Sequence, residues 1–178
     1  MKRALFLGRF QPYHLGHQSV VEQIAREADE LIVAIGSAQW SHDLKNPFTA
    51  GERIMMITRA LAGLPTTTYV LPIEDIQRNA LYAAHIVSLT PPFDVVYSNN
   101  ALVKELFSAA GFAVRTTPLA ARQRYRGAHI RQQMLTGEGW RELVPEAVAR
   151  TIDEVDGVAR LRRTHHEDAP LPVPSQRE

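Results

Sequence analysis

Cysteine is absent from all 178 residues, which excludes disulfide bonds and thiolate metal sites. Charge of one sign is not in excess either: the formal net charge is +1, which argues against binding nucleic acid through a broad basic face. No apolar run is long enough to span a membrane, and the run between Arg3 and Gly8 is too short for a signal peptide. We therefore expect one cytoplasmic domain with no nucleic-acid or membrane partner.

Short apolar runs alternate with segments of helical periodicity along most of the chain. Strands are expected over 4–7, 31–35, 67–71, 93–97 and 112–115, and helices over about 16–28, 50–61, 79–89, 101–110, 127–135 and 145–155. This alternation predicts a Rossmann-like, doubly wound α/β fold, with a parallel sheet of about five strands and helices on both faces. Its ligand site is expected beyond the carboxyl ends of the strands, where the strand order reverses.

The end of the chain differs in composition from the rest. Residues 1–160 are expected to form the domain and 161–178 a disordered tail, because arginines, His165 and His166 are followed there by three prolines. The adjacent histidines are compatible with a metal site, but a solvated, frayed tail is the favoured interpretation.

The segment between the first expected strand and the first expected helix has the most informative chemistry. It lacks both the G-x-G-x-x-G pattern of dinucleotide sites and the G-x-x-x-x-G-K-[ST] pattern of P-loops. Instead it contains Gly8, Arg9, His14 and His17. If the helix begins at about residue 15, both imidazoles lie at its positive end, where free backbone amides and the dipole bind anions. The sequence therefore predicts a phosphate site at this turn, with Gly8 leaving room for the ligand.

Several blocks in a fixed order resemble those of a known family. His14-Leu15-Gly16-His17 looks like the H-x-G-H signature of the nucleotidyltransferase superfamily, and the preceding Gly8-Arg9-Phe10-Gln11-Pro12 makes the likeness closer. With further blocks at 36–39, 46–53 and 90–94, the chain from about residue 3 to about residue 160 resembles the short archaeal-type nicotinamide-nucleotide adenylyltransferases.

The resemblance implies an enzyme that transfers the adenylyl group of ATP to nicotinamide mononucleotide (NMN), giving NAD and pyrophosphate. The phosphate oxygen of NMN would attack the α-phosphorus of ATP directly and in line, so the protein would act by positioning and by stabilising charge. Mg²⁺ or another divalent cation would accompany ATP. The implied catalytic residues are His14, His17, Arg9 and Arg131. The implied ATP-binding residues are Gly8, Arg9, Phe10, Gly16, Lys45, Asn99, Arg126, Gly127 and Arg131.

A second group of residues is implied for NMN: Ser37, Asp75, Ile76, Asn79 and Tyr82. Asn79 and the backbone at Ile76 would bond the carboxamide, and the ring of Tyr82 would stack on the pyridinium, where a π-face attracts positive charge. The alternative is that Asn79 caps a helix and Tyr82 packs in the core, and for Asn79 the two roles are compatible.

The chain departs from the family pattern at Tyr125-Arg126-Gly127-Ala128. The family has hydroxyl residues at positions 126 and 128, which hold the β- and γ-phosphates, so Arg126 would replace a hydroxyl with charge. Lys45 stands where the family tends to have an arginine, and Asn99 where it more often has glycine. Arg122 and Arg124 join Arg126 and Arg131 in a basic cluster that is expected to face phosphate rather than solvent.

Three other functions stay open on the sequence. One is nucleotidyl transfer to another acceptor, such as flavin mononucleotide or phosphopantetheine. Another is a catalytically weak nucleotide-binding sensor, which the missing hydroxyls motivate. A third, disfavoured by the net charge, is an RNA-binding relative of class I tRNA synthetases. Since members of the family form higher assemblies, the resemblance also implies a homo-oligomer.

Overall fold

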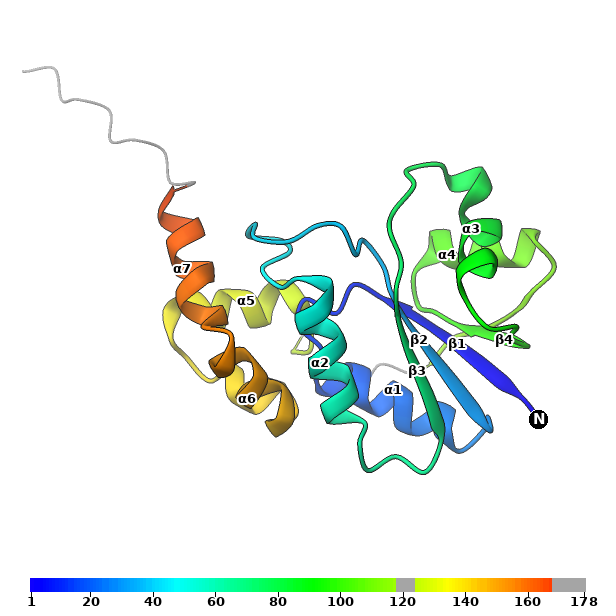
Figure 1. Ribbon diagram of the computed structural model, residues 1–178, viewed down its shortest axis with the longest axis horizontal. Coiled ribbons are helices and arrows are strands. Elements are labelled where there is room, and N and C mark those ends of the chain that lie inside the picture. The colour runs from blue at the N-terminus through cyan, green and yellow to red at the C-terminus, as the bar shows by residue number, and fades with distance from the viewer. Residues whose placement is uncertain (118–123, 168–178) are drawn as a thin grey trace, which may run out of the picture.

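The computed structural model describes residues 1–117 and 124–167, and the remaining residues are the grey traces in Figure 1. Within the described part, five strands form one parallel sheet in the order β3-β2-β1-β4-β5. They are β1 (Arg3–Gly8), β2 (Glu30–Ile35), β3 (Thr67–Pro72), β4 (Val95–Tyr97) and β5 (Ala113–Arg115). The expected Rossmann-like doubly wound sheet is confirmed, and its strand order reverses between β1 and β4.

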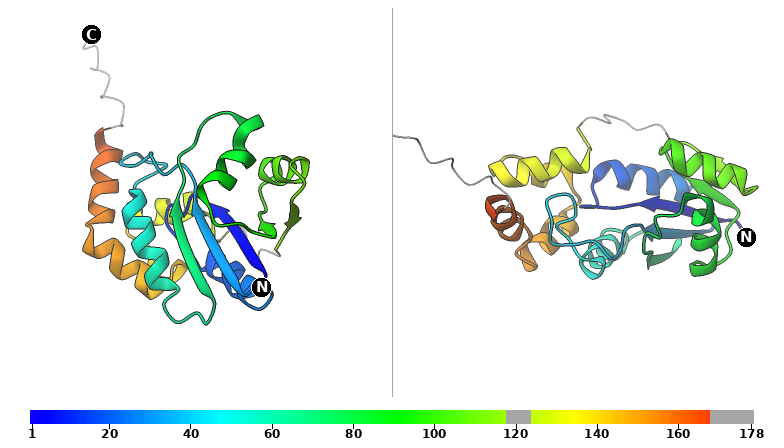
Figure 2. Two further views of the ribbon diagram at one scale, coloured as in Figure 1. Left: turned by 45° about the vertical axis from the view of Figure 1, so that its right-hand side comes forward. Right: turned by 90° about the horizontal axis from the view of Figure 1, so that it is seen from above.

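The helices lie between and after the strands. They are α1 (Leu15–Ala25), α2 (Ala50–Ala60), α3 (Tyr82–Leu89), α4 (Ala101–Ala109), α5 (Gly127–Thr136), α6 (Glu146–Glu154) and α7 (Gly157–Glu167), with the 3-10 helices η1 (Asn79–Leu81) and η2 (Trp140–Leu143). Figures 1 and 2 show α5, α6 and α7 beside α2, on the side away from α3 and α4. No helix in the described ranges is long and apolar enough to cross a membrane.

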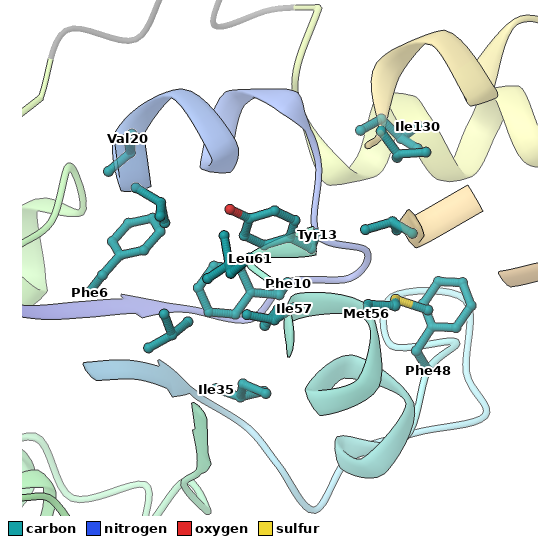
Figure 3. Packing of buried hydrophobic residues seen from close by; sticks show 14 of the residues in the cluster. Phe6, Phe10, Tyr13, Val20, Ile35, Phe48, Met56, Ile57, Leu61 and Ile130 are labelled. Carbon is teal, nitrogen blue, oxygen red and sulfur yellow. The ribbon is translucent and has the colours of Figure 1, made fainter. Parts of the chain in front are cut away.

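The period of two in the strands divides the core between the two faces of the sheet. Ala4 and Phe6 of β1 belong to a cluster with α1, α2 and the C-terminal helices, part of which is drawn in Figure 3. Leu5, which points to the other face, packs in a second cluster with α3 and α4. The inner strands β1, β2 and β4 are buried on both faces, which explains why they read as continuous apolar runs, whereas the edge strands β3 and β5 are partly exposed.

Two boundaries differ from the sequence-based expectation. Asn79 does not cap a helix through its side chain: it begins η1, and α3 begins only at Tyr82. At the other end, α7 continues to Glu167 through residues that were expected in the tail. Leu161 is buried in the first cluster, and the Arg162 guanidinium donates to the Met134 carbonyl, so these contacts stabilise the helix beyond residue 160. Residues 168–178 lie outside the described ranges.

Candidate active site

The N-terminus of α1 is built from two histidines that cap each other. The backbone N–H of His17 donates to Nδ1 of His14, and the backbone N–H of His14 donates to Nδ1 of His17, each at 3.3 Å. The two rings stack with centroids 3.5 Å apart and an interplanar angle of 16°. Because Nδ1 of each neutral ring accepts a hydrogen bond, the ring proton lies on Nε2. Both residues therefore present an Nε2–H donor at the positive end of a helix.

Burial keeps this histidine pair uncharged. Desolvation lowers the pKa of His14 to about 4, and its side chain is almost inaccessible to water. Desolvation also lowers the pKa of His17 well below its ordinary value, and the neighbouring His14 lowers it further. At neutral pH both rings are thus neutral donors, and a phosphate placed against them would raise both pKa values because it stabilises the imidazolium form.

Aromatic side chains fix the orientation of the His17 ring. Phe10 meets it edge-on at 4.8 Å between centroids, and Phe6 and Tyr13 lie at 6.2 and 5.5 Å. A Cβ on Gly8 would stand 2.7 Å from the Phe10 ring, so glycine at this position is needed first for packing. The sequence-based explanation, room for the ligand, is incomplete, although Gly8 also lines a cavity.

Two cavities meet at the histidine pair. One, of about 280 Å³, opens beyond β1 and β4, at the switch point of the sheet, and the other, of about 200 Å³, lies beside the start of α5. The first is lined by Phe6, Leu7, Gly8, His14, His17, Val20, Ser98, Asn99, Asn100, Tyr125 and Arg126. The second is lined by Arg9, Phe10, Gln11, Pro12, His14, His17, Gly127, Ala128 and Arg131.

Arginines give the second cavity its positive charge. Arg9 is exposed, whereas Arg131 is partly buried and donates from Nε to the Leu44 carbonyl at 2.9 Å and from Nη1 to the Gln11 carbonyl at 2.8 Å. Its Nη2 has no partner among the described residues. Arg131 therefore holds two loops together, and its Nη2 is available to bind a ligand. A Cβ on Gly127 would stand 3.1 Å from Nη1 of Arg131, so the lack of a side chain at this position leaves room for the guanidinium.

Three side-chain carboxamides each join two loops at the carboxyl edge of the sheet. Gln11 both donates to and accepts from the Phe48 backbone, at 2.8 and 2.9 Å. Gln39 does the same with the Asp75 backbone, at 2.9 Å for both bonds. Asn99 donates to the Thr117 hydroxyl and accepts from its backbone N–H. Sequence reasoning missed the roles of Gln11 and Gln39, because their partners lie 37 and 36 residues away.

The structure brings most of the implied ATP residues to the two cavities, with two exceptions. The side chain of Lys45 is exposed and lines neither cavity. Gly16 is buried where a Cβ would stand 2.8 Å from Cβ of Tyr125, so it allows the segment before α5 to approach α1. Arg122 lies outside the described residues.

The residues implied for NMN lie apart from both cavities, beyond the ends of β2 and β3. Asn79 is exposed, and the backbone of Asp75 is held by Gln39. Tyr82 is half-buried and packs edge-on against Phe107, with centroids 6.1 Å apart. Burial raises the pKa of its phenol, and the nearby Asp75 carboxylate adds to that effect. Core packing, the alternative for Tyr82, is therefore observed in the structure.

The donors around the two cavities do not suit a metal ion held by the protein. No group of three or more His, Cys, Asp or Glu that could bind one occurs within residues 1–117 and 124–167. Guanidinium groups near the histidine pair repel a cation. A divalent cation would fit here only when phosphate oxygens bring negative charge with them.

Comparisons with known proteins match most of the chain. The model of the cytidylyltransferase-like family matches residues 5–133. The nicotinamide-nucleotide adenylyltransferase of Methanosphaerula palustris is 58% identical over 163 residues, covering 92% of this chain and 97% of that protein. The one from Methanolobus tindarius is 55% identical over 168 residues, covering 94% and 97%.

Among solved structures, the chain resembles a bifunctional NMN adenylyltransferase/ADP ribose pyrophosphatase from Francisella tularensis, complexed with AMP and a manganese ion. The TM-score is 0.73 and the identity 16%, over 96% of this chain and 57% of that one. At this identity the likeness concerns the fold alone.

Proposed function

We propose a function that follows from the family of the chain. The chain belongs to the cytidylyltransferase-like family and, within it, to the nicotinamide-nucleotide adenylyltransferases. It transfers the adenylyl group of ATP to NMN. The products are NAD and pyrophosphate. The observation that supports this function best is the histidine pair. It presents two neutral Nε2–H donors at a helix N-terminus, between the first cavity and the second, which is lined by arginines.

ATP spans the two cavities in this proposal. The adenosine lies beyond β1 and β4, where Ser98, Asn99 and Asn100 offer polar groups, and Arg126 lines the same cavity. The triphosphate passes the histidine pair and enters the second cavity. Arg9 and Arg131 bind it there, together with backbone amides at the start of α5, where no side chain caps the helix.

Catalysis rests on positioning and on charge stabilisation. The phosphate oxygen of NMN attacks the α-phosphorus in line, one P–O bond forms as the bond to the pyrophosphate oxygen breaks, and no covalent enzyme intermediate arises. Nε2–H of His14 and His17 bonds the α-phosphate oxygens as they gain charge. Mg²⁺ bound by the phosphates of ATP would neutralise charge on the leaving pyrophosphate.

The NMN site in this proposal is the group beyond β2 and β3. The nicotinamide and its ribose phosphate are surrounded by Ser37, Asp75, Ile76, Asn79 and Tyr82. The two hydrogen bonds between Gln39 and the Asp75 backbone support this placement, because they hold together the two loops that carry these residues.

The proposal extends to the molecule in solution. The chain works in the cytoplasm without a nucleic-acid or membrane partner, in keeping with its net charge of +1. It forms a homo-oligomer, which would cover apolar side chains that α3 and α4 expose, among them Val87, Leu89 and Leu102. Light scattering during size exclusion measures the assembly, and a strictly monomeric protein contradicts this part.

A panel of acceptors tests the function. Pyrophosphate release from ATP and Mg²⁺ is followed with NMN, flavin mononucleotide, phosphopantetheine or no acceptor, and NAD is identified by its enzymatic reduction to NADH. We expect release with NMN and NAD as the product. Release with another acceptor alone would refute the NMN site, and ATP binding without release would favour a sensor.

A further inference from the structure

Arg53 of α2 is the largest side chain with no solvent exposure in the described protein. Its guanidinium binds only backbone carbonyls. Nη1 donates to Arg9 at 2.9 Å and Gly36 at 3.1 Å, Nη2 to Ser37 at 3.2 Å and Ala38 at 3.3 Å, and Nε to Thr49 at 3.2 Å. A buried charge satisfied in this way costs free energy of desolvation, so its place in the fold calls for an explanation.

The guanidinium of Arg53 forms no ion pair in the described part of the chain. Within residues 1–117 and 124–167 no carboxylate lies within ion-pair distance of it; the neighbouring Glu52 binds Arg160 instead, through two bonds of 2.9 and 2.7 Å. Burial lowers the pKa of Arg53 to about 10, and the nearby Arg9 contributes to that. The guanidinium is still protonated at neutral pH and adds positive charge behind Arg9.

The carbonyls that Arg53 binds belong to two turns of unusual backbone. Phe10, two residues after β1, and Ser37, two residues after β2, have left-handed φ angles of 51° and 50°. Such angles are unfavourable for residues other than glycine and persist only where the surroundings hold them. Nη1 of Arg53 binds the carbonyl that precedes each of these residues. One nitrogen therefore joins the two turns at the carboxyl edge of the sheet.

Because the peptide bond is planar, the hydrogen bonds from Arg53 to the two carbonyls also orient the N–H group that follows each carbonyl. In a trans peptide the C=O and the N–H point in opposite directions. Since the carbonyls of Arg9 and Gly36 point at Arg53, the N–H groups of Phe10 and Ser37 point away from it. In the part of the chain that the structure describes, neither N–H has a hydrogen-bond partner. Both N–H groups are free to bind an anion, and Arg9 and Phe10 line the second cavity.

We infer that Arg53 is a positioning residue of the transfer site: it holds the turns after β1 and β2 so that the amides of Phe10 and Ser37 and the side chain of Arg9 face substrate phosphates. The inference rests on the proposed function in so far as the phosphates are those of ATP and NMN. Arg53 itself contacts neither substrate. Its planar fork is essential, because a lysine ammonium in its place retains the charge but cannot bridge both turns with the same geometry.

The test compares Arg53→Lys with Arg160→Lys. Arg160 is the matched control: its side chain is also largely buried and binds Glu52 of α2, but it touches neither turn. Both variants are expected to unfold at lower temperature than the wild type. At a temperature where both are folded by circular dichroism, we expect Arg53→Lys to lose about tenfold or more in kcat, with a smaller change in either KM. Arg160→Lys should stay within about twofold of the wild type.

A binding measurement separates this inference from the proposed function. Calorimetry of ATP without an acceptor should show weaker binding to Arg53→Lys than to Arg160→Lys, whichever acceptor the enzyme uses. If the wild type makes no NAD, the proposed function fails and the ATP affinities still decide the role of Arg53. A folded Arg53→Lys with wild-type kcat and ATP affinity overturns it.

A third measurement needs no variant and decides the matter if Arg53→Lys does not fold. On addition of ATP and NMN to the wild-type protein, the backbone amide NMR signals of Phe10 and Ser37 should shift, because these N–H groups acquire an acceptor. Signals that stay unchanged at saturating substrates overturn the inference.

Discussion

The imidazole rings of His14 and His17 lie parallel, 3.5 Å apart, and each accepts the backbone N–H of the other residue. This reciprocal arrangement starts α1 at Leu15 and places the ring protons on Nε2. Burial of the pair lowers both pKa values and keeps both rings neutral until an anion arrives. The first two predictions test these consequences.

Replacing His17 by alanine should affect turnover much more than nucleotide affinity. Its Nε2–H bonds phosphate oxygens most strongly when they gain charge in the transition state, and loss of one such donor costs about a hundredfold or more in kcat. The ATP dissociation constant from calorimetry should change by about threefold at most. His165→Ala, at an exposed position of α7, serves as the control and should leave both quantities unchanged. Wild-type kcat in His17→Ala would refute the assigned role.

Acid should destabilise the protein through His14. Its pKa is about 4 in the folded chain and about 6.5 in the unfolded chain, so the unfolded state binds more protons between these values and stability rises with pH there. The free energy of unfolding should be lower by about 3 kcal/mol at pH 4 than above pH 6.5 from this residue alone.

Chemical denaturation at a series of pH values measures this dependence. His14→Gln should reduce the slope of the free energy of unfolding against pH between pH 4 and 6.5. Part of the slope should remain, because the pKa of His17 is also lowered and contributes in the same direction. An unchanged slope in His14→Gln would show that His14 titrates normally in the folded protein.

Gly127→Ala should weaken ATP binding. The new Cβ would stand 3.1 Å from Nη1 of Arg131 and 3.2 Å from the Gln11 carbonyl, so the guanidinium or the carbonyl must shift by a few tenths of an ångström, which strains the hydrogen bond between them. We expect the KM for ATP to rise several-fold with a smaller change in the KM for NMN. Gly63→Ala is the control, because a Cβ there meets no atom within 4 Å. Equal kinetics for the two variants would contradict the place given to Arg131.

Tyr82→Ala should raise the KM for NMN more than that for ATP, because the ring that stacks on the pyridinium is lost. It should also lower the stability, since Tyr82 packs against Phe107. Tyr82→Phe retains the packing and the π-face, so its kinetics and melting temperature should resemble those of the wild type. If Tyr82→Ala loses stability but retains the KM for NMN, the residue belongs to the core and not to the site.

The sequence predicted the features that depend on neighbours along the chain. The apolar runs of β1 and β2 and the position of α1 follow from local periodicity, and the histidine pair lies three residues apart at a helix start. Because carboxyl ends of parallel strands meet at one edge, the order of strands and helices also predicted where the cavities lie. The NMN site stays a prediction, since its residues line neither cavity.

The features that the sequence left unpredicted depend on partners far along the chain. Gln11 and Gln39 are ordinary polar residues until Phe48 and Asp75 lie opposite them. Arg53 gave one signal: it shares a helical face with the buried Met56 and Ile57, where a charged residue is out of place. Its carbonyl partners still could not be named, because they lie in turns whose backbone angles the sequence does not specify.

The most direct test of the account is the NMR spectrum of the imidazole nitrogens in protein labelled with ¹⁵N-histidine. At neutral pH without ligand, His14 and His17 should both be neutral with the proton on Nε2. Addition of ATP, Mg²⁺ and NMN should shift both Nε2–H signals, while those of His165 and His166 on α7 stay in place. Protonation on Nδ1 in the free protein, or Nε2 signals that do not respond to saturating substrates, would contradict the assignment of the histidine pair to the phosphates.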